Sequence, residues 1–303
     1  MIDLLIAITL GGIFFLIRGF FLLVYSQKWK IPKQPFPGNW NELLEEHIPY
    51  YSFLNAEEKF KFKQRIHIFL FNVKITGIKT YVTDLDKIRI AASAIIPVFS
   101  FPDWEYSFLE EVLLYPDDFT IKIGENESPK MKGMVLGNNY LNGKIMFSQK
   151  ALEEGFQNNH DKMNVGIHEF VHFIDKADEQ IDGIPKKLLQ NSAVAGWIHL
   201  MHTKISEILK NESDIRTYGS TRSAEFLAVT SEYFFERPVI MKKKHPRLYA
   251  FISTIYKQNP ALKKKTFDAI SQTKSQDKCP CGSGKYFKDC CEKYNLIENK
   301  HIL

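Results

Sequence analysis

The sequence predicts an α+β fold that is mostly helical and contains a small mixed sheet. Apolar residues recur at helical spacing before residue 96 and again after residue 164. Short strand-like segments bounded by proline, glycine and asparagine lie between these two regions. The chain has 303 residues, of which 45% are hydrophobic and 25% charged, as in ordinary globular proteins. These proportions exclude a disordered or fibrous chain, and we expect one large domain over residues 40–270 with shorter appendages.

The N-terminal segment predicts a membrane anchor over residues 1–27. Residues 4–25 are almost continuously apolar, and about 22 helical residues at 1.5 Å each span the roughly 30 Å hydrocarbon core of a bilayer. A removable signal peptide is the disfavoured alternative, because no basic segment precedes this run and no small-residue cleavage site follows it. Lys28, Lys30 and Lys33 follow the run, so the positive-inside rule predicts a single-pass protein whose remaining chain faces the cytoplasm.

The elements of the large domain are expected from periodicity and turn signals. Residues 28–39 hold three prolines, which favours a stiff linker. Apolar residues at helical spacing predict helices around Leu43 to Tyr51, Phe60 to Phe71, Ile88 to Ile96, Ile167 to Asp175, Leu188 to Lys210 and Ser223 to Phe235. Runs between turn residues predict strands at Ile75 to Val82, Glu111 to Tyr115, Phe119 to Ile123, Gly133 to Gly137 and Lys144 to Ser148. Asp84 or Asp86 is a possible cap of the third helix.

The net charge is unevenly distributed along the chain. From Pro238 to the C-terminus there are 14 Lys and Arg against 5 Asp and Glu, a net charge of +9. The preceding part of the chain has a net charge of −4, which brings the total to +5. The runs Lys242–Lys244 and Lys263–Lys265 would suit an anionic lipid or a nucleic acid. A solvated basic face is favoured, and a nucleic-acid partner is not expected, because no aromatic residues are interleaved in a recognition motif.

The segment His168-Glu169-Phe170-Val171-His172 predicts a metal site. The two histidines lie one helical turn apart on one face, so both imidazoles reach one metal ion while Glu169 points beside it as a general base. Chance supplies such a motif in roughly 2 of 100 chains of this composition. The apolar residues around it indicate a helix buried on most sides with a polar stripe facing a cleft. The alternative is a core helix with two hydrogen-bonded histidines.

A catalytic zinc ion needs a third protein ligand, and three residues compete for this role. Asp178 stands where the metzincin pattern has its last ligand, but that pattern requires glycine at the position of Asp175. Asp175, one turn after His172, is placed to ligate the metal or to orient an imidazole from behind. Glu225 is favoured, because it lies on a later amphipathic helix, the usual source of this ligand in gluzincins.

Tyr218 precedes Glu225 by seven residues and lies just outside the expected helix. It is either a packed loop tyrosine or a donor of a hydrogen bond to a developing oxyanion. Spacing alone does not separate these two interpretations.

These segments resemble the MtfA family of zinc peptidases, the glucose-regulated metallopeptidases, which share a site design with the anthrax lethal factor catalytic domain. Further segments resemble family blocks in the same order, over about residues 40–237: Thr83-Asp84, Ile88 to Ala94, Val112 to Pro116 and Ile145 to Ser148. The resemblance implies a zincin-like (gluzincin) metallopeptidase domain. It also implies that His168, His172 and Glu225 bind the zinc ion, that Glu169 is the base and that Tyr218 assists the oxyanion. Relatives often have tryptophan after Ser148, where this chain has Gln149, which affects the expected substrate preference.

The expected activity is hydrolysis of peptide bonds in a peptide or protein substrate. A strand at the edge of the cleft is expected to pair with the extended substrate backbone. The candidates are Lys144, Ile145, Met146, Phe147 and Ser148. The competing class is a membrane-tethered regulatory protein that sequesters a partner such as a transcriptional repressor, as the family's link to a sugar-uptake repressor suggests. The presence of both Glu169 and Tyr218 favours an active enzyme.

The C-terminal tail predicts a second, structural zinc site over residues 278–295, after a polar linker at 271–277. Cys279, Cys281, Cys290 and Cys291 form two close pairs separated by glycines, and so few residues need a metal ion to fold. Disulfides or free thiols are disfavoured, because adjacent cysteines make a poor bridge and the expected compartment is reducing. The tail resembles the SEC-C motif at the end of SecA, which implies contact with a protein partner or the ribosome.

Overall fold

The computed structural model describes residues 29–106, 108–120, 122–123, 126–127, 130–135, 143–158, 161–278 and 284–289. Its α-helices are α2 (Asn39–His47), α3 (Pro49–Ser52), α4 (Ala56–Asn72), α5 (Asp84–Val98), α6 (Gln149–Gln157), α7 (Val165–Asp175), α8 (Asn191–Leu209), α9 (Ser223–Glu236), α10 (Pro238–Lys244), α11 (Pro246–Tyr256) and α12 (Pro260–Ser271). Its short 3₁₀ helices are η1 (Lys176–Asp178), η2 (Thr217–Ser220) and η3 (Phe287–Asp289). Its strands are β1 (Lys74–Gly77), β2 (Glu111–Tyr115), β3 (Lys122–Ile123), β4 (Asn126–Glu127), β5 (Gly133–Val135) and β6 (Lys144–Ser148). The prediction of a mostly helical protein with a small mixed sheet is confirmed.

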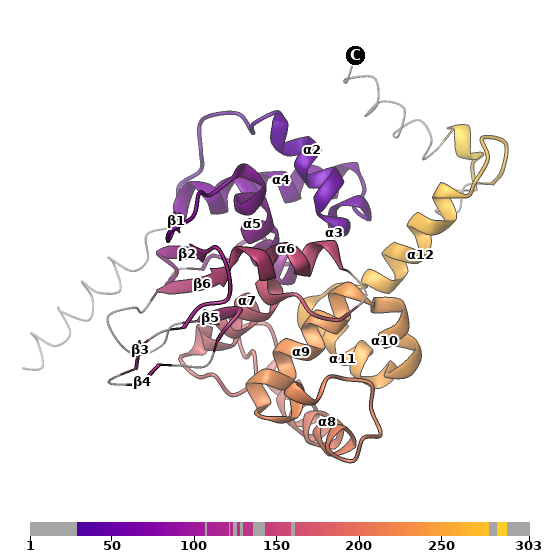
Figure 1. Ribbon diagram of the computed structural model, residues 1–303. Coiled ribbons are helices and arrows are strands. Elements are labelled where there is room, and N and C mark those ends of the chain that lie inside the picture. The colour runs from indigo at the N-terminus through magenta and orange to yellow at the C-terminus, as the bar shows by residue number, and fades with distance from the viewer. Residues whose placement is uncertain are drawn as a thin grey trace, which may run out of the picture.

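The main sheet has the strand order β1-β2-β6-β5. Strands β1, β2 and β6 are parallel, with Val112 opposite Ile145, whereas β5 runs antiparallel to β6, with Val135 opposite Ile145 from the other side. Strands β3 and β4 form a separate antiparallel pair. Strand β5 is therefore one edge of the main sheet, and Figure 1 shows it next to α7.

The expectation that residues 144–148 form the edge of the cleft is wrong. Strand β6 is paired with β2 on one side and with β5 on the other, so its backbone donors and acceptors are already used within the sheet. The side chains of Ile145, Phe147 and Ser148 are fully buried, and Lys144 pairs with Glu111 of β2. Strand β6 is therefore an interior strand that pairs with the edge strand β5.

Helix α5 is the central helix of the N-terminal half and packs against α2, α4, α6 and α7. It starts at a capping box in which Thr83 and Asp86 bond each other's backbone N–H groups, which satisfies two free donors of the first turn. At its C-terminal end, Arg65 of α4 donates to the carbonyls of Val98 and Phe99. Because nearly every residue between these ends is buried, α5 forms a rigid wall behind α7.

The C-terminal half is built around α9, which packs against α7, η2, α8, α10 and α11. Figure 1 shows α8 to α11 gathered on one side of the molecule, with α12 extending from them. The sequence interpretation places no helix after Phe235, yet α10 and α11 begin with Pro238 and Pro246. Proline is tolerated in the first turn, where its missing N–H would have no helical partner, so these prolines start helices.

Two strand predictions are shorter in the structure. The run expected from Ile75 to Val82 forms a strand only as far as Gly77. Of the run Phe119 to Ile123, Lys122 and Ile123 pair with β4, and Phe119 forms an isolated bridge with Met131. Beyond Gly77, the N–H of Ile78 still donates to the carbonyl of Leu114 in β2 at 2.7 Å, but the run does not continue as a strand.

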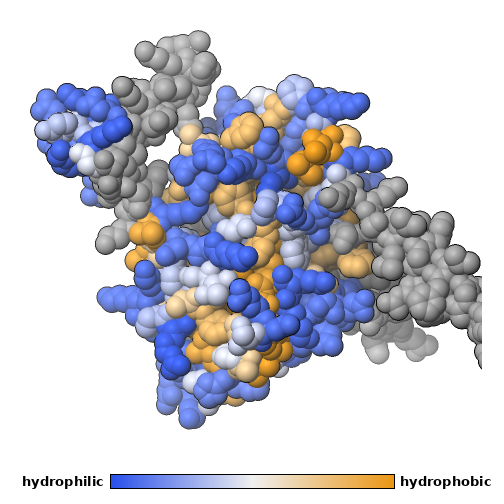
Figure 2. All heavy atoms as spheres, turned by 180° about the vertical axis from the view of Figure 1, so that it is seen from behind, coloured by the Kyte–Doolittle hydropathy of each residue, from blue (hydrophilic) through white to orange (hydrophobic). Residues whose placement is uncertain are grey.

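The expected anchor over residues 4–25 and the four tail cysteines lie outside the described residues. Within the described ranges, no helix combines the length and the apolar character needed to cross a bilayer. The face of the molecule opposite to that in Figure 1 is largely hydrophilic, and apolar residues are exposed between the hydrophilic ones (Figure 2).

Candidate metal centre

Helix α7 carries the histidine motif and is held at its start by Asn164. The Asn164 side chain accepts a hydrogen bond from the N–H of Ile167 at 3.0 Å and donates to the carbonyl of Gly155. The N–H of Asn164 itself donates to Glu232 of α9. One face of α7 buries Phe170 and Val171 in the core, so the opposite face, with the two histidines, is turned toward α9.

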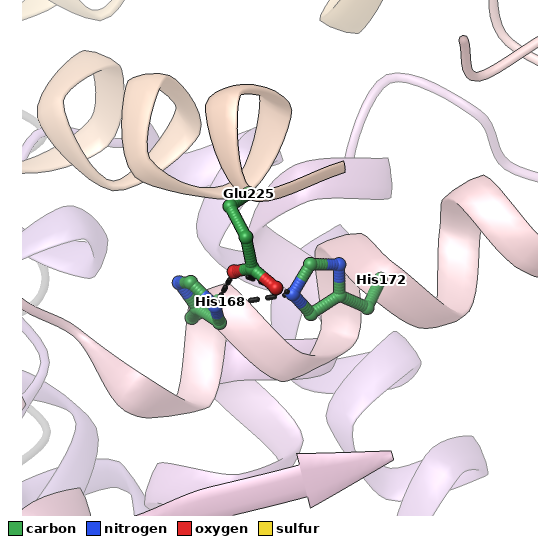
Figure 3. A group of neighbouring side chains, drawn as sticks. All are labelled: His168, His172 and Glu225. Carbon is green, nitrogen blue, oxygen red and sulfur yellow. Dashed lines mark hydrogen bonds and ion pairs between the residues drawn. The ribbon is translucent and has the colours of Figure 1, made fainter. Parts of the chain in front are cut away.

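Three side-chain atoms converge between α7 and α9 (Figure 3). Oε2 of Glu225 lies 3.1 Å from Nε2 of His168 and 3.3 Å from Nε2 of His172. The two Nε2 atoms are 3.1 Å apart. Glu225 comes from the first turn of α9 and points down between the two imidazoles, which share one face of α7.

Glu232 determines which nitrogen of His168 carries the proton. Its Oε1 lies 2.8 Å from Nδ1 of His168 and also accepts a hydrogen bond from Arg216. Because a carboxylate only accepts hydrogen bonds, Nδ1 must donate, and in a neutral ring the lone pair is then on Nε2, facing Glu225. Two acceptors would repel each other there unless a cation lies between them.

The three atoms fit a metal ion. Donors about 2.0–2.1 Å from a tetrahedral zinc ion lie roughly 3.3 Å from one another, close to the separations observed here. Burial opposes a charge on His168, but the nearby Glu232 and Glu225 outweigh this effect and raise the pKa of His168 to about 10. The centre therefore holds positive charge firmly, as a proton or as a metal ion. Among the described residues, His168, His172 and Glu225 form the cluster with metal-ligand geometry.

Glu169 and Tyr218 lie beside these three candidate ligands. Glu169 is 7% exposed, and burial raises the pKa of its carboxyl above the usual value while the adjacent His168 and His172 oppose that shift. Tyr218, in η2, places its ring centroid 6.0 Å from that of His168. Partial burial, followed by the charges of Glu225 and Glu169, raises the pKa of the phenol, so it remains a hydrogen-bond donor at neutral pH.

An open cleft of about 650 Å³ gives access to these groups. Its lining comes from strand β5 and the residues just before it, from α6 and α7, and from η2 with the start of α9. Its lining includes the apolar side chains Met131, Met134, Met163 and Ile181. The cleft therefore exposes the cluster of His168, His172 and Glu225 beside β5.

The loop that carries Arg216 and Tyr218 is attached to the protein body through Asp214. The carboxylate of Asp214 accepts hydrogen bonds from Lys162, Tyr233, Lys244 and His245. Burial opposes its ionisation, but these donors prevail and hold the pKa of Asp214 well below its usual range. This network fixes the start of η2 relative to α9 and α10.

A model of the family described as glucose-regulated metallo-peptidase M90 matches residues 23–257. The chain belongs to this M90 family. The match includes both α7 and α9 and ends before the cysteine tail. Membership of a metallopeptidase family implies a bound metal ion, in agreement with the three converging ligand atoms.

Relatives of this M90 chain cover most of its length. An uncharacterized protein of Synechocystis is 26% identical over 244 residues, which are 76% of this chain and 87% of the relative. A protein of Escherichia fergusonii named Mlc titration factor A is 29% identical over 254 residues, covering 78% of this chain and 92% of its own. A protein of the same name from Klebsiella pneumoniae is 27% identical over 259 residues, with 78% and 94% coverage.

Among the three candidate ligands, the fold of this M90 chain brings only Glu225 to the histidines. Asp178 lies in η1 and forms an ion pair with Lys186 at 3.4 Å. Asp175 bonds neither imidazole, since Nδ1 of His172 and Oδ1 of Asp175 each lack a hydrogen-bond partner. The expectation that Asp175 orients an imidazole is therefore wrong, and Glu232 has that position.

Asp175 instead joins the end of α7 to the start of α9. Its Oδ2 accepts the N–H of Gly183 at 2.8 Å, and the carbonyl of Gly183 accepts Nε1 of Trp197 at 2.7 Å. Gly183 has φ +77°, and a Cβ atom there would lie 2.3 Å from the carbonyl oxygen of Ser223. This contact positions the first turn of α9, from which Glu225 reaches the histidines.

Two functional residues of the M90 site escaped the sequence interpretation. Glu232 lies seven residues after Glu225 on α9, and the i, i+7 spacing, which places both on one helix face, is a signal that would have found it. Arg222 precedes α9 and donates to Oε1 of Glu225. No local pattern marks that arginine, because its role depends on the rotamer of Glu225.

Proposed function

We propose that this protein is a zinc-dependent peptidase whose zinc ion is held by His168, His172 and Glu225. The observation that carries the proposal is the convergence of three acceptor atoms at 3.1 to 3.3 Å, with a buried carboxylate beside them. Glu232 supports the set by holding His168 in the tautomer that ligation requires.

When bound, zinc supplies a water molecule whose pKa is lowered toward about 7 and polarises the substrate carbonyl. Glu169 accepts the proton of that water. Its raised pKa brings it closer to the working pH, which suits a group that must take a proton and then give it to the leaving amine. Tyr218 donates its phenolic hydrogen to the carbonyl oxygen as negative charge develops there.

The substrate backbone is proposed to pair with β5. This strand is bonded to β6 on one side, and no described strand pairs with its other side. An extended peptide can add to such an edge through main-chain hydrogen bonds. Recognition by β5 replaces the role expected for residues 144–148.

The test is Glu169→Gln, which preserves size but removes the base. We expect peptide hydrolysis to fall by about 10³-fold or more with one zinc ion still bound at the centre. Glu154→Gln is the control, because Glu154 lines the cleft but pairs with Lys132 at its rim. Hydrolysis by the Glu169→Gln protein at close to the wild-type rate would refute the assignment.

A second candidate function is the binding of a regulatory partner such as a transcriptional repressor. It is supported by the name Mlc titration factor A of the relatives from Escherichia fergusonii and Klebsiella pneumoniae. In this case Glu169→Gln abolishes hydrolysis but leaves the partner's affinity and the cellular effect unchanged. A cellular effect lost together with hydrolysis would favour the enzyme as the main function.

We further propose that residues 4–25 anchor the domain to a membrane with the catalytic body in the cytoplasm, and that the cysteine tail holds a second zinc ion that recruits a protein partner or the ribosome. Protection of the tail from added protease in intact cells tests the orientation.

Deletion of residues 277–293 tests the tail, since it is expected to remove one of two zinc equivalents per chain. An unchanged metal content would exclude the tail site.

A further inference from the structure

Strand β5 passes close to α7 at Gly133, beside the side chain of Glu169. A Cβ atom at Gly133 would lie 2.8 Å from Oε1 of Glu169, 2.8 Å from its Cγ and 2.6 Å from Cγ2 of Val165. All three distances are shorter than real Cβ atoms show. A side chain at position 133 therefore requires the strand, the helix or Glu169 to move.

The strand has little freedom to move. Gly133 is in register with Phe147 and Met134 with Met146 of β6. The N–H of Ser148 also donates to the carbonyl of Lys132 at 2.8 Å. Displacing β5 from α7 would break hydrogen bonds to an interior strand of the sheet.

The helix is also held, from its opposite side. Gly166 of α7 lies against α5 so closely that a Cβ there would be 2.0 Å from Oγ of Ser93. The start of α7 is fixed by Asn164, which bonds both Gly155 and Glu232. With β5 and α7 both fixed, the group that moves most easily is the Glu169 side chain, because a side chain can change rotamer while the backbone stays in place.

We propose that Gly133 is a positioning residue: its missing side chain leaves the space in which the Glu169 carboxylate lies, and so keeps Glu169 in the rotamer in which it would serve a zinc ion held by His168, His172 and Glu225. The inference rests on the proposed peptidase function and deepens it. It assigns to β5 a second role besides substrate pairing, since the same backbone that meets the substrate also sets the position of the base.

The first test is Gly133→Ala. We expect kcat to fall about 10- to 100-fold, because misplacing a catalytic group by about 1 Å has effects of this size, while KM changes less than threefold and zinc content is unchanged. A crystal structure of the zinc-loaded variant is expected to show Glu169 in a different rotamer. Gly38→Ala is the control, since a Cβ there meets no atom within 4 Å.

Gly133→Ala combined with Val165→Ala separates positioning from packing. Removal of the valine methyl groups relieves the 2.6 Å contact but leaves the contact with Glu169. We expect thermal stability to recover in this double variant while kcat stays low. Recovery of both together would show a purely structural role and overturn the inference, as would an unchanged Glu169 rotamer in Gly133→Ala. If the zinc-loaded wild-type protein hydrolyses no peptide, the peptidase proposal fails, and the rotamer in the crystal structure still tests the effect of Gly133 on Glu169.

Discussion

Glu232 lies 2.8 Å from Nδ1 of His168, so the same helix that supplies the ligand Glu225 also orients one of the imidazoles that Glu225 faces. The two glutamates are seven residues apart on α9. Helix α9 therefore sets both the position of Glu225 and the tautomer of His168, and any shift of α9 relative to α7 changes both.

Replacing Glu232 by Gln is expected to weaken zinc binding about 10- to 100-fold, the usual effect of losing a group that orients a ligating histidine. Competition with a fluorescent chelator measures the affinity. Glu236→Gln is the matched control, one turn further along α9, and is expected to bind zinc as the wild-type protein does. Equal affinities for Glu232→Gln and wild type would contradict the orienting role.

Glu236→Gln is expected to stabilise the protein at alkaline pH. Burial and then the charge of Glu232 raise the pKa of Glu236 to about 9, against the opposing effects of Arg216 and Asn164. Its folded-state pKa exceeds the unfolded value near 4.3. The stabilisation from its bound proton is thus complete below about pH 4 and is lost as the pH rises toward 9.

Glutamine does not titrate, so the Glu236→Gln protein should keep this stability, with a gain of up to about 5 kcal/mol at pH 8 and none at pH 4. Urea unfolding at both pH values measures the difference. Glu154→Gln, at an exposed ion pair, should show no such pH dependence. A gain of the same size at pH 4 would mean that packing, and not ionisation, is responsible.

Gly183→Ala is expected to damage the metal centre from a distance. Alanine is strained at φ +77°, and its Cβ would lie 2.3 Å from the carbonyl oxygen of Ser223, so unfolding should become easier by about 2 kcal/mol. Because Ser223 begins α9, zinc affinity should fall as well. Gly196→Ala, whose Cβ meets only Phe251 at 3.4 Å, is the control. Unchanged zinc affinity in Gly183→Ala would show that the contact between Gly183 and Ser223 does not position the metal centre.

Tyr218→Phe removes the proposed donor to the oxyanion but keeps the ring near His168. We expect kcat to fall about 10²-fold, with zinc content and KM close to wild type. Steady-state kinetics with a peptide substrate measure both constants. A rise in KM with unchanged kcat would instead indicate that Tyr218 only binds the substrate.

The motif on α7 was predictable because its geometry is local. Residues four apart on a helix share a face whatever surrounds them, so His168 and His172 had to point the same way. Glu225 was favoured but not decided, because Asp175 and Asp178 are nearer in sequence. The fold excludes them by turning Asp175 toward Gly183 and Asp178 toward Lys186.

The strand at the cleft was not predictable in the same way. An alternating or apolar pattern predicts that a segment forms a β-strand, but not whether that strand has one neighbouring strand or two. The neighbouring strands come from distant parts of the chain. The sequence of residues 144–148 is compatible with an edge strand and with an interior strand, and in the structure β6 lies between β2 and β5.

The sequence by itself determined the mostly helical fold class and the pair of histidines on one helix face with Glu169 next to them. The tertiary structure decided which carboxylate completes the centre, that Glu232 orients His168, and that Gly133 of β5 faces Glu169. The physical reason is that helical spacing is enforced by backbone hydrogen bonds within one segment. Packing of α7 against α9 and β5, in contrast, depends on side chains that are 30 to 70 residues apart in the chain.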